Sequence, residues 1–217
     1  MKMNDKIDKI RNHYLPRIKS CRKNYDVLDW AAGETQLLRF SILADNVPLN
    51  GLTLLDVGCG LGDLAQYLAV RKIALCRYAG VDVLPEMLLR ARQDKPELEL
   101  FAADIFAMSA HAALSFLKAD KPFDVVYCSG AFNLNLGNNE SFMQNAVEKM
   151  AALASKWLVF NCLHARHKIK DDRYYAYQPT AAMAAVRAAC GDAEIHILDK
   201  YLENDFTVIC RIPDFQP

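Results

Sequence analysis

Hydrophobic positions along this chain change their spacing near residue 50. Over residues 1–48 they recur at helical spacing, with breaks near Pro16 and residues 31–33, which predicts a leading group of helices. From residue 52, short apolar runs alternate with amphipathic stretches, and this alternation is typical of a parallel sheet with helices on both faces. We therefore expect an α/β fold in which a helical lid, residues 1–48, belongs to the same domain as residues 49–217.

The second part of the chain supplies the strands. Apolar runs predict strands at residues 52–57, 77–82, 98–102, 123–128, 157–163, 195–202 and 206–212. Helical patterns are expected between them, including residues 109–118, 140–154 and 179–190. The last two strands are separated by only a few polar residues, which permits an antiparallel hairpin and excludes a parallel return. The predicted fold class is a doubly wound, mostly parallel seven-stranded sheet with a C-terminal antiparallel strand.

A glycine-rich turn follows the first predicted strand. Residues 54–63 read Leu-Leu-Asp-Val-Gly-Cys-Gly-Leu-Gly-Asp, with Gly58, Gly60 and Gly62 spaced two apart. Glycine adopts positive φ freely and lets a ligand lie against the backbone. The helix expected next presents free N–H groups at its N-terminus. This run therefore predicts a small-molecule site on the turn.

The spacing of these glycines argues against a nicotinamide dinucleotide. The dinucleotide fingerprint is G-x-G-x-x-G, whereas here the third glycine comes one position early and Asp63 takes the sixth place. Carboxylates at Asp56 and Asp63 would repel a doubly charged pyrophosphate. The same two acids favour a ligand that carries positive charge.

Four segments, in order, resemble the class I S-adenosylmethionine-dependent methyltransferases. Residues 54–63 resemble their first motif, D-x-G-x-G-x-G, and residues 80–87 resemble the end of their second strand. Residues 102–106 are similar to the segment after the third strand, and residues 123–129 to the fourth strand. S-adenosyl-L-methionine carries a sulfonium and an ammonium group, which is the kind of charge that the acids of the turn favour.

The resemblance implies which residues bind this cofactor. In the family, the acid in the place of Asp82 accepts hydrogen bonds from both ribose hydroxyls, and the acid in the place of Asp104 binds the adenine amino group. The set of cofactor contacts that it implies is Asp56, Gly58, Cys59, Gly60, Gly62, Asp82, Val83, Met87, Asp104, Ile105 and Ser129. The implied activity is methyl transfer by an enzyme.

Residues that bind the methyl acceptor are expected at the carboxyl ends of the fourth and fifth strands and in the leading helices. His164 follows the fifth strand and is the best-placed imidazole for a general base, with bonding to a loop carbonyl as the alternative. The candidate substrate contacts are Trp30, Arg39, Asn133 and Tyr174, each with simple packing as the alternative. Arg166 and His167 are further candidates for an anionic group.

The loop at residues 129–135 bears on the acceptor. It lacks the Asn/Asp-Pro-Pro-aromatic tetrad with which methyltransferases acting on adenine or glutamine hold a planar nitrogen. This departure argues against those acceptors. We expect a small-molecule acceptor, because the formal net charge is zero and no recognition domain is appended.

The composition of the chain bears on its location in the cell and on the state of its cysteines. No stretch approaches the ~18 apolar residues of a membrane span, and residues 1–9 are polar, so a cytoplasmic protein is expected. Seven cysteines, none in a C-x-x-C pair, indicate reduced thiols and neither a disulfide framework nor a metal site. Cys76, Cys128, Cys162 and Cys210 fall on predicted strands, where burial is expected.

The first 23 residues are strongly basic. A basic arm binds nucleic acid in some proteins, but the apolar stripe of Ile7, Ile10 and Tyr14 favours a solvated helix face here. Two alternatives to the enzyme stay open. One is a non-catalytic partner subunit that binds S-adenosylmethionine or S-adenosylhomocysteine, and the other is the disfavoured nicotinamide oxidoreductase.

Overall fold

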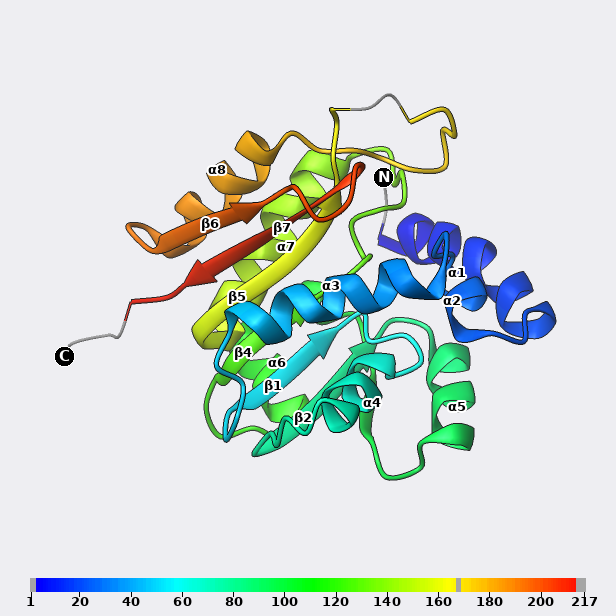
Figure 1. The fold of residues 1–217 in the computed structure, drawn as a ribbon, viewed down its shortest axis with the longest axis horizontal. Helices are drawn as coiled ribbons and strands as arrows, with labels where there is room; N and C mark the ends of the chain where they lie inside the picture. Colours follow the sequence, from blue (N-terminus) through cyan, green and yellow to red (C-terminus); the bar gives the residue numbers. More distant parts are fainter. Residues whose placement is uncertain (1–2, 167–168, 214–217) are drawn as a thin grey trace.

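A seven-stranded sheet in the order β3-β2-β1-β4-β5-β7-β6 forms the centre of the molecule (Figure 1). The computed structural model describes residues 3–166 and 169–213, with side chains from residue 5 onward. The strands are β1 Thr53–Val57, β2 Arg77–Asp82, β3 Glu99–Ala102, β4 Phe123–Cys128, β5 Ala154–Leu163, β6 Glu194–Leu198 and β7 Asp205–Arg211. Strands β1 to β5 pair in parallel, and β7 runs antiparallel to both β5 and β6. The predicted fold class is confirmed.

The order of the strands creates a point where the chain reverses its direction of travel across the sheet. From β1 the chain adds β2 and β3 on one side, and it then returns to place β4 on the other side of β1. In open α/β sheets, ligands bind outside the carboxyl ends of the strands at such a point. The ends of β1 and β4 are therefore the expected place for a site.

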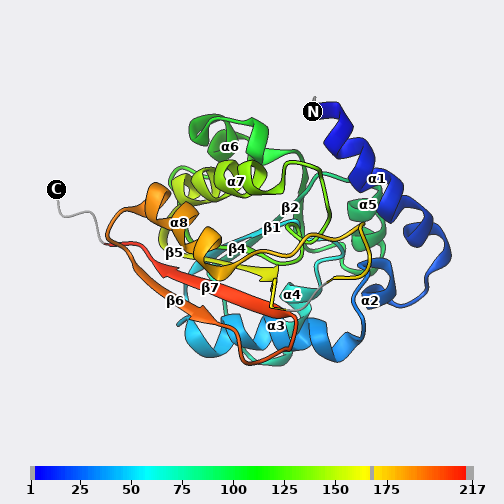
Figure 2. The same cartoon turned by 90° about the horizontal axis from the view of Figure 1, so that it is seen from above.

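Helices cover both faces of the sheet. In Figure 2, α6, α7 and α8 lie over one face, and α3 and α4 lie under the other. The helices are α1 Met3–Ser20, α2 Asn24–Val27, α3 Gly33–Asn46, α4 Asp63–Val70, α5 Pro85–Asp94, α6 Ala110–Phe116, α7 Asn139–Leu153 and α8 Pro179–Cys190, with a 3₁₀ turn η1 at Ile105–Ala107.

The two faces of the sheet carry separate cores. Along β4, Val126 and Cys128 pack into the core under α7 and α8, while Val125 and Tyr127 pack into the core against α3 and α4. A strand buried on both faces reads as a continuous apolar run. This is why the sequence from Val125 to Cys128 shows no alternation of polar and apolar residues.

A third core joins the N-terminal helices to the glycine turn. Val27 of α2 packs with Leu61 of the turn and with Met87 of α5, and Ile10 and Tyr14 of α1 lie against the same cluster. Figures 1 and 2 both show α1 and α2 beside α5 at one end of the molecule. The N-terminal segment is therefore part of the site's surroundings.

The structure corrects three local predictions. Helix α1 continues through Pro16, because a proline removes only one main-chain hydrogen bond and the packing of Tyr14 and Ile18 in the third core holds the helix on both sides of it. Cys76 was expected on a buried strand, but it is exposed and lies just before β2. Strand β6 ends at Leu198, earlier than its apolar run predicts.

A buried ion pair fastens α3 to β7. Arg39 Nε donates to Asp205 Oδ2 at 2.9 Å, and Asn161 Nδ2 donates to Asp205 Oδ1 at 3.2 Å. Asp205 is fully buried and Arg39 is 4% exposed. Two charges at such a place depend on each other, because neither has water as a replacement partner.

Asp205→Ala is expected to lower the free energy of unfolding by about 3–5 kcal/mol, because it leaves the Arg39 guanidinium buried without its carboxylate. Urea unfolding measures this change. Asp45→Ala is the matched control, since it breaks the exposed Arg71–Asp45 pair, and its effect is expected to be far smaller. Equal losses in the two variants would contradict the assignment.

Candidate functional site

The glycine turn after β1 is held by main-chain hydrogen bonds to β2. The N–H groups of Gly58 and Cys59 donate to the Val81 carbonyl at 2.8 and 3.1 Å, and the N–H of Gly60 donates to Asp82 Oδ2 at 3.0 Å. Gly60 has φ +54°, and a Cβ there would lie 2.7 Å from Leu28 Cδ2. Only glycine fits this conformation and this contact without strain.

Asp82 ends β2 with its carboxylate fixed from two sides. Besides the Gly60 contact, Oδ1 accepts the N–H of Leu84 at 2.9 Å. Burial raises the pKa of Asp82, while these main-chain donors act to lower it. Each carboxylate oxygen has two lone pairs, so both oxygens keep acceptor capacity. The side chain is therefore a rigid acceptor at the mouth of β2.

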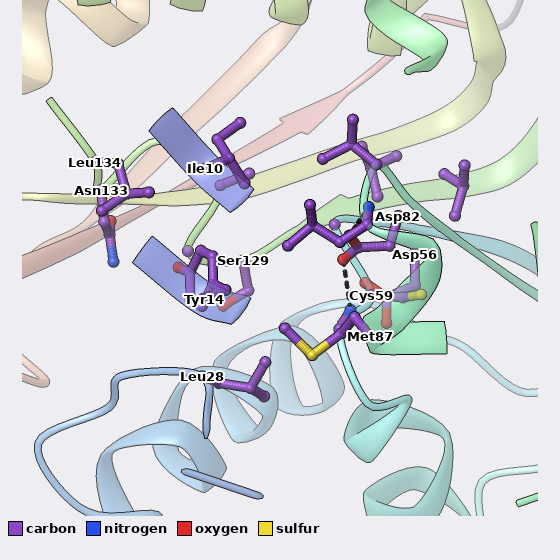
Figure 3. A pocket seen from close by; sticks show the side chains of 18 of the residues that line it. Ile10, Tyr14, Leu28, Asp56, Cys59, Asp82, Met87, Ser129, Asn133 and Leu134 are labelled. Carbon is purple, nitrogen blue, oxygen red and sulfur yellow. Dashed lines mark hydrogen bonds between the residues drawn. The ribbon is translucent and has the colours of Figure 1, made fainter. Parts of the chain in front are cut away.

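A cavity extends from the glycine turn across the ends of β1, β2 and β4. In Figure 3, Asp82 and Met87 lie at one end of it, Asn133 and Leu134 lie at the opposite end, and Tyr14 and Ser129 lie between them. Ile7, Ile10 and Tyr14 of α1 also line the cavity, as do residues 28–30 after α2. The N-terminal segment thus forms one wall of it.

Asp56 is a buried acid in the wall of this cavity. It is 4% exposed, and Tyr78 Oη donates to its Oδ2 at 2.6 Å. Burial raises the pKa of Asp56 to about 7, with Asp82 and Asp63 adding to the shift and the Tyr78 hydrogen bond opposing it. A nearby cation would favour the ionised form.

Asp63 does not act as a free acid. Lys95 Nζ donates to its Oδ1 at 2.8 Å, and the side-chain amides of Asn24 and Gln36 donate to its two oxygens. Asp63 was predicted to place a negative charge next to the ligand, but Lys95 compensates this charge. Asp56, which is buried, and Asp82, which is partly buried, have no basic partner in the described hydrogen bonds and ion pairs.

Asp29 joins three distant segments beside the cavity. Its carboxylate binds His13 and Arg17 of α1 and the hydroxyl of Tyr174, with 2.8 Å between His13 Nε2 and Oδ2. The backbone of Asp29 has φ +60°, a strained conformation for a residue other than glycine. Burial alone would raise the pKa of Asp29, but His13, Tyr174 and Arg17 together lower it.

Trp30 is clamped between two neighbours. The Arg39 guanidinium lies 4.3 Å from the centre of one of its rings, and a Cβ on Gly130 would lie 2.9 Å from its Cη2. Trp30 Nε1 and Asn133 Oδ1 are buried and find no hydrogen-bond partner within the described part of the chain. Buried polar groups in native proteins are normally paired, so these two atoms are unusual features of the cavity wall.

Most of the residues singled out from the sequence gather around this one cavity. Those that line it are Trp30, Asp56, Gly58, Cys59, Gly60, Asp82, Val83, Met87, Asp104, Ile105, Ser129, Asn133 and Tyr174. Asp104 Oδ1 also accepts the N–H of Phe106 at 3.1 Å, and burial raises its pKa. Gly62, Arg39 and His164 are absent from the lining, and His167 lies outside the described residues.

Each of these three has a structural role that accounts for its position. Gly62 is the N-cap of α4, and Arg39 forms the ion pair with Asp205. His164 is 7% exposed, its Nδ1 accepts the N–H of Arg166 at 3.0 Å, and its ring packs edge-on against Phe206. The prediction of His164 as a general base therefore finds no support in the geometry.

The leading helices were expected beside the acceptor, but three residues that they and the following loop contribute to the cavity were not predicted. Tyr14, Leu28 and Asp29 line the cavity, yet none was predicted there. The apolar stripe of α1 was a usable signal, because its members Ile7 and Ile10 face the cavity. No local sequence pattern predicts the role of Asp29, because its partners His13 and Tyr174 lie 16 and 145 residues away.

Two kinds of feature are absent from the described residues. None of their helices has the length and apolar character to cross a membrane. Among the same residues, no group of three or more His, Cys, Asp or Glu side chains is arranged to hold a metal ion.

The known proteins and families that this chain resembles are methyltransferases. Residues 54–155 match the family model described as a methyltransferase domain. A magnesium protoporphyrin IX methyltransferase from Synechocystis PCC 6803, with bound S-adenosylhomocysteine, has a similar fold with a TM-score of 0.66 at 16% identity, over 96% of this chain and 97% of that one. No curated protein sequence matches.

Two other solved structures share the fold. An N-methyltransferase from Bradyrhizobium japonicum WM9, in complex with S-adenosylhomocysteine, has a TM-score of 0.62 at 20% identity, over 94% of this chain and all of that one. An amino pentose methyltransferase from Micromonospora echinaspora has a TM-score of 0.61 at 17% identity, over 93% and 96%.

The sheet order and the glycine turn define a Rossmann-like class of protein whose fold these neighbours share. Residues 54–155 match a methyltransferase domain, and the chain shares its fold with methyltransferases that bind S-adenosylmethionine or S-adenosylhomocysteine.

The buried carboxyl of Asp56 predicts a pH dependence of stability. In the folded protein its pKa is about 7, against an ordinary value of 3.8. Between these values the folded state binds a proton that the unfolded chain has lost, so this contribution to stability falls as pH rises from about 4 to 7 and is constant above that. At ~1.4 kcal/mol per pKa unit, the loss is about 4 kcal/mol.

Urea unfolding of wild type and Asp56→Asn at pH 4, 5, 6 and 7 measures this contribution. We expect the variant to gain stability relative to wild type as pH rises through this window. Asp192→Asn, at an exposed position, serves as the control. Parallel curves for wild type and Asp56→Asn would show that Asp56 is ionised throughout.

Proposed function

We propose that this chain transfers a methyl group from S-adenosylmethionine to a small-molecule acceptor, and that both bind in the one cavity. The observation that carries the proposal is the continuity of that cavity. It runs from the fixed carboxylate of Asp82 to the unpaired amide oxygen of Asn133 (Figure 3). Donor and acceptor would therefore meet beside the ends of β1 and β4.

The residues present fit the cofactor. Asp82 would hold the ribose hydroxyls with the acceptor capacity that its two main-chain contacts leave. Asp104 would hold the adenine amino group, with Val83 and Ile105 beside the ring. The absence of a side chain at Gly60 lets Leu28 of the N-terminal segment pack directly on the turn.

The acidic side chains that line the cavity favour a cationic nucleoside over a dinucleotide as its ligand. Lys95 neutralises Asp63, so the support comes from the buried Asp56 and the partly buried Asp82 at the ligand end of the sheet. A sulfonium or ammonium group near Asp56 would stabilise its ionised form, whereas a pyrophosphate would add two negative charges to a poorly hydrated site.

The bound cofactor supplies a methyl group on a positively charged sulfur. The chain's own part is to orient the acceptor in line with that group and to exclude water. Orientation of this kind is worth ~7–11 kcal/mol of the barrier when the reacting atoms are held in near-attack geometry. The clamped ring of Trp30 and the fixed loop after β4 supply rigid walls for this task.

Residues 3–48 act as a lid in this proposal. Asp29 supports the role, because it ties α1 to the loop that carries Tyr174 and so closes the cavity from two sides. The ion pairs of Arg11 with Glu86 and of Arg17 with Asp29 engage part of the basic arm within the molecule. This favours a small-molecule acceptor over nucleic acid.

Calorimetry with S-adenosylhomocysteine tests the cofactor site. Asp82→Asn is expected to weaken binding at least tenfold, because an amide cannot accept a hydrogen bond at both of its positions. Asp192→Asn, an exposed change of the same chemistry, is expected to bind as wild type does. Near-wild-type affinity in Asp82→Asn, or tighter binding of a nicotinamide dinucleotide, would contradict the proposal.

Transfer itself is tested with S-adenosylmethionine labelled in its methyl group. After incubation with a small-molecule extract, we expect the label in a new product. Cofactor binding without labelled product from any extract would favour the alternative, a non-catalytic partner subunit.

A further inference from the structure

Helix α1 lies across the cavity. Its side chains Ile7, Ile10 and Tyr14 line the cavity, and Figure 3 shows Ile10 and Tyr14 between the end marked by Asp82 and the end marked by Asn133. Ile10 and Tyr14 also pack against the third core, which joins the N-terminal helices to the glycine turn. A ligand in the cavity therefore lies under α1.

The segment after α2 covers the turns at the ends of β1 and β4. A Cβ on Gly60 would lie 2.7 Å from Leu28 Cδ2, and a Cβ on Gly130 would lie 2.9 Å from Trp30 Cη2. Residues 28–30 are thus in direct contact with both turns. Because ligands of such a sheet bind outside the ends of these strands, the segments that cover the turns have to give way when a ligand enters.

The C-terminal end of α1 is fastened to α5. Arg90 Nη1 donates to the carbonyls of Ile18 and Cys21 at 2.9 and 2.8 Å, and its Nη2 donates to the Arg22 carbonyl at 3.0 Å. Basic side chains commonly satisfy the free carbonyls at the end of a helix in this way. One end of α1 is therefore held to the body of the protein, while residues nearer the other end line the cavity.

Near its middle, α1 is held by the carboxylate of Asp29. This carboxylate binds His13 and Arg17, and the side chains of His13 and Asp29 are only 9% and 15% exposed. The ion pair of Arg11 with Glu86 is longer, at 3.6 Å, and its side chains are 41% and 34% exposed. Because water screens exposed pairs more strongly, Asp29 is the more effective tie.

The same carboxylate also holds the facing wall of the cavity. The Tyr174 hydroxyl donates to Asp29, and the ring centres of His13 and Tyr174 lie 6.1 Å apart. Tyr174 itself lines the cavity. Release of Asp29 would therefore loosen two walls at once.

We propose that α1 is a hinged gate over the cavity, with the Arg90 contacts as its hinge and the carboxylate of Asp29 as its latch. This inference rests on the proposed function, which assigns the cavity to S-adenosylmethionine and S-adenosylhomocysteine. While the latch is closed, these ligands neither enter nor leave. When His13 and Arg17 release Asp29, α1 swings about its fastened end and the cavity opens. The fraction of time that the gate is open then scales entry and exit alike.

Stopped-flow fluorescence with S-adenosylhomocysteine tests the gate. The chain has two tryptophans, so Trp157→Phe in every variant leaves Trp30, in the cavity wall, as the reporter. Asp29→Asn is expected to raise both the association and the dissociation rate constant about tenfold, with the dissociation constant nearly unchanged. Asparagine tolerates the positive φ of this residue. Arg17→Gln, which breaks the latch from the side of α1, is expected to shift both rate constants in the same direction.

Asp26→Asn, the same change on the same segment, is the matched control and is expected to leave both rate constants as they are. Loss of an ordinary ligand contact acts mainly on dissociation. A rise in the dissociation rate alone, unchanged rates, or an equal effect in Asp26→Asn would therefore overturn the gate. Failure of the wild-type protein to bind S-adenosylhomocysteine would instead reject the proposed function.

Discussion

The carboxylate of Asp82 is the constraint on which the site depends. It receives the N–H of Gly60 from the turn after β1 and the N–H of Leu84 from the turn after β2. Because β1 and β2 pair in parallel, both turns reach the same edge of the sheet, and this one side chain fixes them relative to each other. The glycine turn is thus a rigid surface whose shape is set before a ligand arrives.

Holding an acid in this place has an energetic cost that the ligand can offset. Asp56 is buried and Asp82 is partly buried, and desolvation raises the pKa of each. Burial without a paired cation disfavours ionisation, so a positively charged ligand recovers part of that cost. Asp63 shows the contrast, because Lys95 already compensates its charge and leaves it a structural role at the start of α4.

Sequence patterns predicted the sheet and the cofactor end of the site, because both depend on local features. Buried strands such as β4 are apolar runs, and the turn after β1 needs glycines at fixed spacing. The lid and the acceptor end depend on contacts between distant segments. Asp29 meets Tyr174 across 145 residues, and His164 is turned into the packing around Phe206, which no local pattern reveals.

A crystal structure of the protein with S-adenosylhomocysteine tests the central claim most directly. The account predicts the two ribose hydroxyls within hydrogen-bond distance of the two oxygens of Asp82, with the adenine ring beside Ile105 and the sulfur facing the end of β4. Electron density for the nucleoside elsewhere, or a ribose turned away from Asp82, would contradict it.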